Sequence, residues 1–202
     1  METLLSSRSI RSLLAALSIA FFGFALAACG ADENVDQAGV GKGADAAGGK
    51  EAIEVVIEGE PVEVDPFEYN VLFTRPLNRF DVEDREYLVG QPPPKPGETY
   101  IGVFVKVANI DDVAHAVPET FEIVDTSGRR HESIESDSIY ALPKGAMLDP
   151  GDELPEIDSS AQVGPIQASM LLFKVADEVL ELRPVELELK GEEERAAVEL
   201  DL

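Results

Sequence analysis

A period of two in the apolar residues, repeated along the chain after residue 53, is the feature that most limits what this protein can fold into. The clearest case is 100–108, where β-branched residues fill every second position of one face. Successive side chains point to opposite faces of a strand, so this pattern predicts strands with one face in a core. No convincing stretch with the 3.6-residue period of an amphipathic helix follows residue 52. The residues expected on the core face of 100–108 are Ile101, Val103, Val105 and Val107.

About seven strands separated by turns predict an all-β fold, an antiparallel sandwich of two sheets, with an open barrel as the alternative. At the end of the chain, 185–190 and 198–202 are expected to form a closing hairpin, and a short helix over 192–197 is the competing interpretation. The expected strands are 54–57, 68–75, 100–108, 120–124, 130–134, 166–175, 185–190 and 198–202.

Strict alternation in the second expected strand assigns its side chains to faces. It places Phe73 on the same face as Tyr69 and Val71, and it places Leu72 and Thr74 on the opposite face.

Three connections between the expected strands are informative. The turn 125–128 ends in Gly128, which supplies the positive φ that a tight hairpin needs. The loops 76–98 and 135–164 are much longer than most connections, and the prolines of 91–97 stiffen the first towards polyproline II. Loops of this length are usually functional or ordered against the body of the domain.

Residues 1–28 have the organisation of an export signal. A short basic segment precedes an apolar run from 13 to 26, which is too short for an ordinary membrane-spanning helix. The run ends in Ala27, Ala28 and Cys29, a pattern that resembles a bacterial lipoprotein box. The resemblance implies cleavage between Ala28 and Cys29 and a lipid such as palmitate on Cys29. The alternatives are a secretory signal with a chance cysteine, or an uncleaved anchor.

The remaining chain divides into a tether and a domain. Residues 29–52 are rich in Gly, Ala and Asp and contain no aromatic residue, which predicts a flexible tether. Residues 53–202 have the length of one domain with a core of its own. Because Cys29 is the only cysteine, the domain has no internal disulfide.

The charge balance excludes one class of partner. The chain carries 40 acidic and 16 basic residues, for a formal net charge of −24. Such a surface repels phosphate backbones, so nucleic-acid binding is not expected. The charge predicts either attraction to cations or basic partners, or simply good solvation.

Three segments together resemble a known group of domains. They are 100–109, 121–129 and 164–176. They are similar to the immunoglobulin-like domains of unknown function carried by many bacterial lipoproteins, most of all those of the actinobacterial type. The resemblance covers about 67–189 and implies a β-sandwich behind a lipid anchor. It implies no set of catalytic residues, because no enzymatic activity defines the group.

Candidate metal ligands are few. His115 and His131 are the only histidines, and their spacing matches no zinc motif. Asp149, Asp152 and Glu153 share one turn-rich loop, whose composition suits weak extracellular calcium binding. The alternative is that these residues only stabilise a turn. Calcium-dependent melting that is lost in Asn variants would support a calcium site.

The remaining candidates are aromatic. Tyr87 and Tyr140 fall in the two long loops, where an exposed ring could anchor a partner. The alternative is that each ring packs its loop onto the sandwich. No motif for a nucleophile with its base appears, so neither an enzyme nor a cofactor is expected.

These observations predict a lipid-anchored module on the extracytoplasmic face of the cell membrane. It would act by binding an envelope protein or another surface partner, with the loops 76–98 and 135–164 as the contact surfaces. The alternatives are a passive structural or antigen-like surface module, and a calcium-responsive domain that uses its acidic loops.

Overall fold

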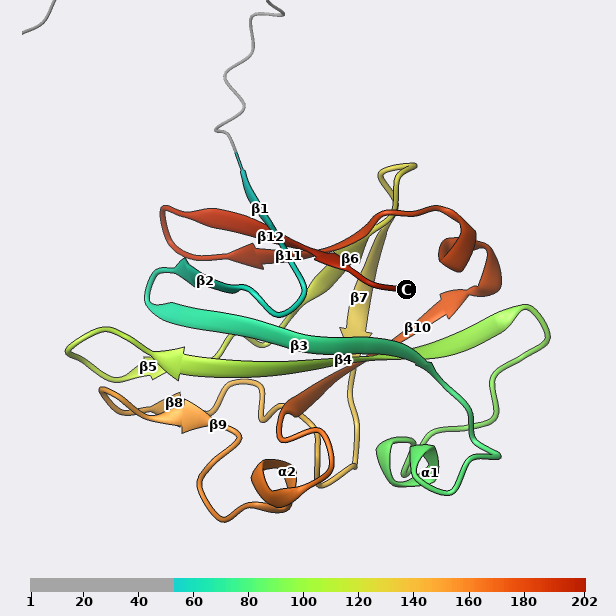
Figure 1. The fold of residues 1–202 in the computed structure, drawn as a ribbon, viewed down its shortest axis with the longest axis horizontal. Coiled ribbons are helices and arrows are strands. Elements are labelled where there is room, and N and C mark those ends of the chain that lie inside the picture. The colour runs from blue at the N-terminus through green and yellow to red at the C-terminus, as the bar shows by residue number, and fades with distance from the viewer. Residues whose placement is uncertain (1–52) are drawn as a thin grey trace, which may run out of the picture. The chain divides into compact units, whose positions relative to one another are not determined.

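The computed structural model describes residues 53–202, so the expected signal peptide, the cleavage site at Ala28 and Cys29, and the tether lie outside it. The described chain forms mainly strands, with two single-turn α-helices, α1 (Asp84–Tyr87) and α2 (Ser160–Val163), and a 3-10 helix, η1 (Asp177–Glu181) (Figure 1). None of these helices is long and apolar enough to cross a membrane. The strands are β1 (Glu54–Ile57), β2 (Pro61–Val64), β3 (Phe67–Leu77), β4 (Glu98–Asn109), β5 (His115–Ala116), β6 (Glu122–Val124), β7 (Arg130–Ile134), β8 (Met147–Leu148), β9 (Glu153–Leu154), β10 (Ser169–Ala176), β11 (Val185–Lys190) and β12 (Arg195–Leu200).

The strands form two layers that share one strand. The order β1-β12-β11-β6-β7 makes one layer, here sheet A, and β7-β10-β4-β3-β2 makes the other, sheet B (Figure 1). The first half of β7 pairs with β6, and its end at Ser133 and Ile134 pairs with β10. The expected all-β sandwich is confirmed. Shorter strands outside the expected set complete it: β9 pairs with β4, and β5 pairs with β8.

The main core lies between the sheets, where the alternation in β4 predicts it. The inward residues Ile101, Val103, Val105 and Val107 are fully buried, opposite Ile123 and others from sheet A. Burying such side chains stabilises the fold by about 1.5–3 kcal/mol each. The alternation in β4 is therefore confirmed residue by residue.

A second apolar cluster lies on the outer face of sheet B. Tyr100 and Phe104 point outward from β4, yet both are buried because the two long loops cover them. The members of this cluster, here the outer cluster, are Leu77, Tyr87, Leu88, Tyr100, Phe104, Ala168, Met170 and Leu172. The expectation that long loops are ordered against the domain is met here.

A β-bulge in β3 corrects the expected faces of that strand. The register with β4 runs from Val71 directly to Phe73, so Leu72 is the extra residue. A single extra residue moves all later side chains to the opposite face. Thr74 consequently joins Val71 on the buried side and is 3% exposed, whereas Phe73 turns outward, stacks on Phe104 and is 43% exposed.

Two further expectations are settled in sheet A. β11 and β12 form the expected closing hairpin, so the alternative helix over 192–197 is wrong. The sandwich is not wholly antiparallel, because β1 runs parallel to β12 from the pair Glu54 and Ala196 to the pair Ile57 and Glu199. A long connection joins these two strands, and only such a connection allows parallel pairing.

Candidate functional site

Tyr87 and Tyr140 fasten the two long loops to each other. The ring of Tyr87 lies 5.0 Å from that of Phe104 and 5.1 Å from that of Tyr140, in edge-to-face contacts. Tyr87 is 4% exposed, and burial is the main cause that raises its pKa. Tyr140, which is half-buried, donates a hydrogen bond of 3.1 Å from its hydroxyl to Glu86. Both rings therefore pack their loops onto the sandwich, as the alternative to partner binding predicts. A direct role in binding stays a prediction.

Hydrogen bonds between the loops add to this packing. The Ser138 hydroxyl in the second loop donates to the Glu86 carbonyl in the first, at 2.8 Å. The first loop is also held at its start, where buried Asp84 accepts a hydrogen bond of 2.7 Å from the backbone of Asn78 and pairs with Arg75 of β3. The loops thus present a surface that is supported from below rather than free.

The acidic loop does not gather its carboxylates into a cage. Asp149, Asp152 and Glu153 are all exposed, and the Asp152 carboxylate accepts a hydrogen bond of 3.2 Å from the Asp149 backbone. Among residues 53–202, no group of three or more His, Cys, Asp or Glu residues is placed to hold a metal ion. The geometry agrees with the alternative that these residues stabilise a turn. Calcium binding stays a prediction.

The acidic loop borders a hollow of about 390 Å³ instead. Asp152, Glu153 and Glu156 line it together with Met147 and Ile157, which are 62% and 75% exposed. Exposed apolar side chains rimmed by charge are typical of contact surfaces. The sequence signals the acidic residues of this hollow but not its two apolar residues, which look like ordinary loop residues.

Asp125 organises the turn between β6 and β7. Its buried carboxylate accepts hydrogen bonds from the backbone of Ser127 at 2.9 Å and from the backbone and side chain of Arg129, both at 3.1 Å. His131 approaches it at 3.4 Å. Desolvation is the largest single influence and raises the pKa of Asp125. The hydrogen bonds that its carboxylate accepts, first of all one from the Ser127 hydroxyl, together outweigh desolvation and hold the pKa well below its usual range. These contacts tie the turn to the start of β7.

The other histidine also pairs with a carboxylate. His115 Nε2 lies 2.6 Å from Asp111 in the connection after β4, and this hydrogen bond is the main cause that lowers the pKa of Asp111. The contact closes a loop over Phe67, whose ring meets the imidazole edge-to-face. Each histidine therefore lies beside a carboxylate that is close to it in sequence.

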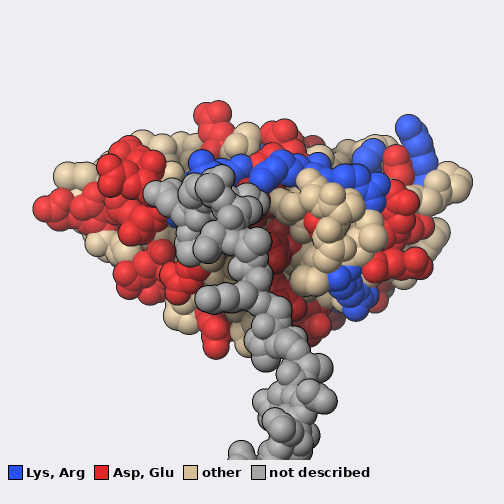
Figure 2. Space-filling view, turned by 90° about the horizontal axis from the view of Figure 1, so that it is seen from above, with Lys and Arg blue, Asp and Glu red and all other residues tan. Residues whose placement is uncertain are grey.

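Charged side chains cover the outer surface unevenly. Figure 2 shows Asp and Glu atoms over much of the visible face, with Lys and Arg atoms gathered in a band among them. On sheet A, Arg130 pairs with Glu188 at 2.7 Å, and Lys190 pairs with Glu122. These exposed pairs contribute little stability, but they neutralise the carboxylates that they touch.

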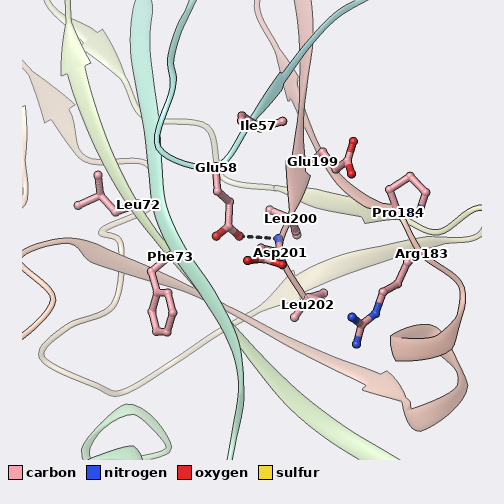
Figure 3. A pocket seen from close by; sticks show the side chains of 10 residues that line it. All are labelled: Ile57, Glu58, Leu72, Phe73, Arg183, Pro184, Glu199, Leu200, Asp201 and Leu202. Atoms are coloured by element: carbon pink, nitrogen blue, oxygen red, sulfur yellow. Dashed lines mark hydrogen bonds between the residues drawn. The ribbon is translucent and has the colours of Figure 1, made fainter.

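Another hollow lies where the exposed edge of β3 faces the end of β12. It has a volume of about 730 Å³. Figure 3 shows Glu58, Glu199 and Asp201 around it, with Arg183 on one side. The apolar residues that line it are Ile57, Leu72, Phe73, Pro184, Leu200 and Leu202. Sequence reasoning misses this hollow, because it depends on a bulge and on the pairing of distant strands.

The comparisons with known proteins support the fold and nothing beyond it. No protein-family model and no curated protein sequence matches the chain. The YjhA protein of Bacillus subtilis is similar in structure, with a TM-score of 0.50 and 13% identity over 72% of this chain and 99% of that one. An uncharacterized β-sandwich protein of Clostridium difficile 630 gives a TM-score of 0.48 and 14% identity over 76% of this chain and 98% of that one.

Proposed function

We propose that this chain is a lipid-anchored immunoglobulin-like module of the extracytoplasmic membrane face that acts by binding an envelope protein. The lipoprotein pattern that ends in Cys29 supports the anchor. The loops 76–98 and 135–164 support the binding role, because the outer cluster fixes them to sheet B. A supported loop surface loses little conformational entropy on binding, which favours affinity.

One observation carries the binding proposal. Seven of the thirteen large apolar side chains that are exposed in residues 53–202 lie in these two loops, which hold about a third of the described residues. Phe80 and Ile157 are the most exposed, at 87% and 75%. The other five are Val82, Val89, Ile139, Met147 and Val163. Aliphatic and aromatic anchors with acidic neighbours suit a protein partner better than a nucleic acid.

The anchor gives the first prediction. Replacing the only thiol with Cys29→Ser removes the atom that takes the lipid, so we expect the protein to lose most of its membrane association. Fractionation of cells and metabolic labelling with a palmitate analogue measure this. Ala38→Ser in the expected tether is the matched control and should leave both signals unchanged. A Cys29→Ser protein that still carries the label would contradict the anchor.

The loop surface gives the second prediction. We expect the double variant Phe80→Asp/Ile157→Asp to reduce crosslinking to its main partner at least about tenfold, because both apolar anchors are lost. Crosslinking in intact membranes followed by mass spectrometry measures the adducts. Val113→Asp is the control, since Val113 is 52% exposed but lies outside both loops.

The same experiment separates this proposal from a passive surface module. A dominant adduct that is lost in the double variant and kept in the control supports a dedicated binding module. Adducts with abundant bystanders alone, at equal yield in all three proteins, would contradict it and favour the passive module.

A further inference from the structure

Half of β3 has a free edge. β3 pairs with β4 from Phe67 to Leu77, whereas β2 pairs with it only from Phe67 to Asn70. The backbone of Gly59 donates a hydrogen bond of 2.7 Å to the Val71 carbonyl and closes the paired part. From residue 72 onward, the described chain places no second strand beside β3. Natural sheets usually block or cover such an edge, because it is ready to pair with another chain.

The hollow of about 730 Å³ lies along this edge. Leu72 and Phe73 of β3 line one side, and the end of β12 with Leu202 lines the other (Figure 3). Phe73 is 43% exposed and Ile57 is 57% exposed, so apolar surface faces solvent beside unpaired backbone. A hydrogen bond of 3.0 Å from the Asp201 backbone to the Glu58 carboxylate joins the segment after β12 to the segment after β1 (Figure 3). This hydrogen bond links two parts of the groove lining that are far apart in sequence.

The charged residues around the groove indicate the net charge of a ligand that would fit it. Glu58, Glu199 and Asp201 line it, and Arg183 is the one basic residue in its lining. None of the three carboxylates forms an ion pair within residues 53–202, in contrast to Glu122 and Glu188 on the same sheet. Uncompensated carboxylates beside apolar surface favour a cationic ligand with apolar neighbours.

We propose that this groove binds an extended, basic segment of a partner polypeptide as an added strand on β3. Main-chain hydrogen bonds to the free edge would give affinity, and alternate side chains would reach the apolar floor and the carboxylates. The added strand pairs with residues 72–75, because Pro76 has no backbone N–H and ends the usable edge. This binding mode is separate from the loop surface and does not depend on it.

A second copy of the same chain fits the groove less well. Each chain has a formal net charge of −24, so two copies repel each other as they approach. The groove itself is acidic, and an identical groove offers it no complementary charge. The acidic groove therefore attracts a basic partner and repels a second copy of the chain.

The probe that tests the proposal is an eight-residue peptide of alternating valine and lysine. Binding to the full-length protein in detergent micelles is measured by isothermal titration, and amide hydrogen exchange locates the contact. We expect added protection at residues 72–75 and no binding of the same peptide N-methylated at alternate residues. N-methylation removes donors but leaves charge and side chains unchanged, so it separates strand addition from simple attraction.

Charge-reversal variants provide the second arm. We expect Glu199→Lys/Asp201→Lys to weaken binding of the peptide at least about tenfold. The control Glu192→Lys/Glu193→Lys makes the same change in net charge at the opposite end of the β11–β12 hairpin and should weaken binding less than about threefold. Phe80→Asp/Ile157→Asp should leave binding unchanged, which keeps this test independent of the loop surface.

Three outcomes would overturn the proposal. The first is equal binding of the N-methylated peptide, which would mean electrostatic attraction alone. The second is equal weakening by the two charge-reversal pairs, which would mean that the groove carboxylates have no special role. The third is protection of residues 72–75 that rises with protein concentration and without peptide, which would make a second copy the occupant.

Discussion

Replacing Tyr87 by alanine is expected to lower the free energy of unfolding by about 3–4 kcal/mol, the usual cost of deleting a large buried aromatic side chain. Tyr87 is 4% exposed and its ring contacts both Phe104 and Tyr140. Its loss leaves a cavity under the outer cluster and removes the contact that joins the two long loops. Urea denaturation measures the change in stability, and hydrogen exchange shows where it falls.

The location of the effect matters as much as its size. We expect exchange to rise in 76–98 and 135–164 and to stay slow in β4 and β10. Tyr87→Phe is the control, because it keeps the ring and should cost less than about 1 kcal/mol. A loss of stability in Tyr87→Ala without faster exchange in the second loop would show that Tyr87 does not couple the loops.

The second large effect is expected at Asp125. Asp125→Ala removes the acceptor for Ser127, Arg129 and His131 at once and should lower the free energy of unfolding by about 3 kcal/mol. The turn also reaches η1, because Arg129 donates to Glu178 at 2.6 Å, so the end of β10 should loosen with it. Urea denaturation at neutral pH measures the loss. Thr126→Ala, an exposed change in the same turn, is the control and should cost less than about 0.5 kcal/mol.

The pH dependence of this effect has a definite sign. The folded pKa of Asp125 lies below its ordinary value, so the carboxylate stabilises the fold fully above the unfolded pKa, which is about 3.9. That stability is lost as the pH falls from about 4 towards the folded pKa. The difference in stability between the wild-type protein and Asp125→Asn should therefore stay constant from pH 7 to 5 and shrink below pH 4. A difference that grows on acidification would contradict the assignment.

Local patterns predict the centre of this fold well. In β4, the inward and outward residues follow the alternation without exception, because one face meets sheet A and the other meets the loops. The β6–β7 turn follows equally well, since Gly128 has the positive φ, 81°, that the sequence leads one to expect. In both places, the residues that decide the structure are neighbours in sequence.

Features that depend on residues far apart in sequence cannot be predicted from local patterns. Nothing in Leu72 marks it as a bulge, which arises where β3 must follow β4. Phe73 is consequently assigned to the wrong face, and the groove beside it goes unseen. The outer cluster is hidden for the same reason, because Tyr87 and Tyr140 are 53 positions apart and meet only once both loops have folded onto sheet B. Candidate binding residues can be named from the sequence, but their burial cannot.

The parallel pairing of β1 with β12 has a mechanical consequence. A pull that enters through the chain before Ile53 acts along β1, the first strand of the described domain. Since β1 lies beside β12 over four residue pairs, a pull along its axis loads all their hydrogen bonds in shear at the same time. A hairpin pulled apart at its open end yields one bond after another instead. In the function proposed above, a domain tethered ahead of β1 would therefore resist tension between membrane and partner in shear, and its first strand would not peel away bond by bond.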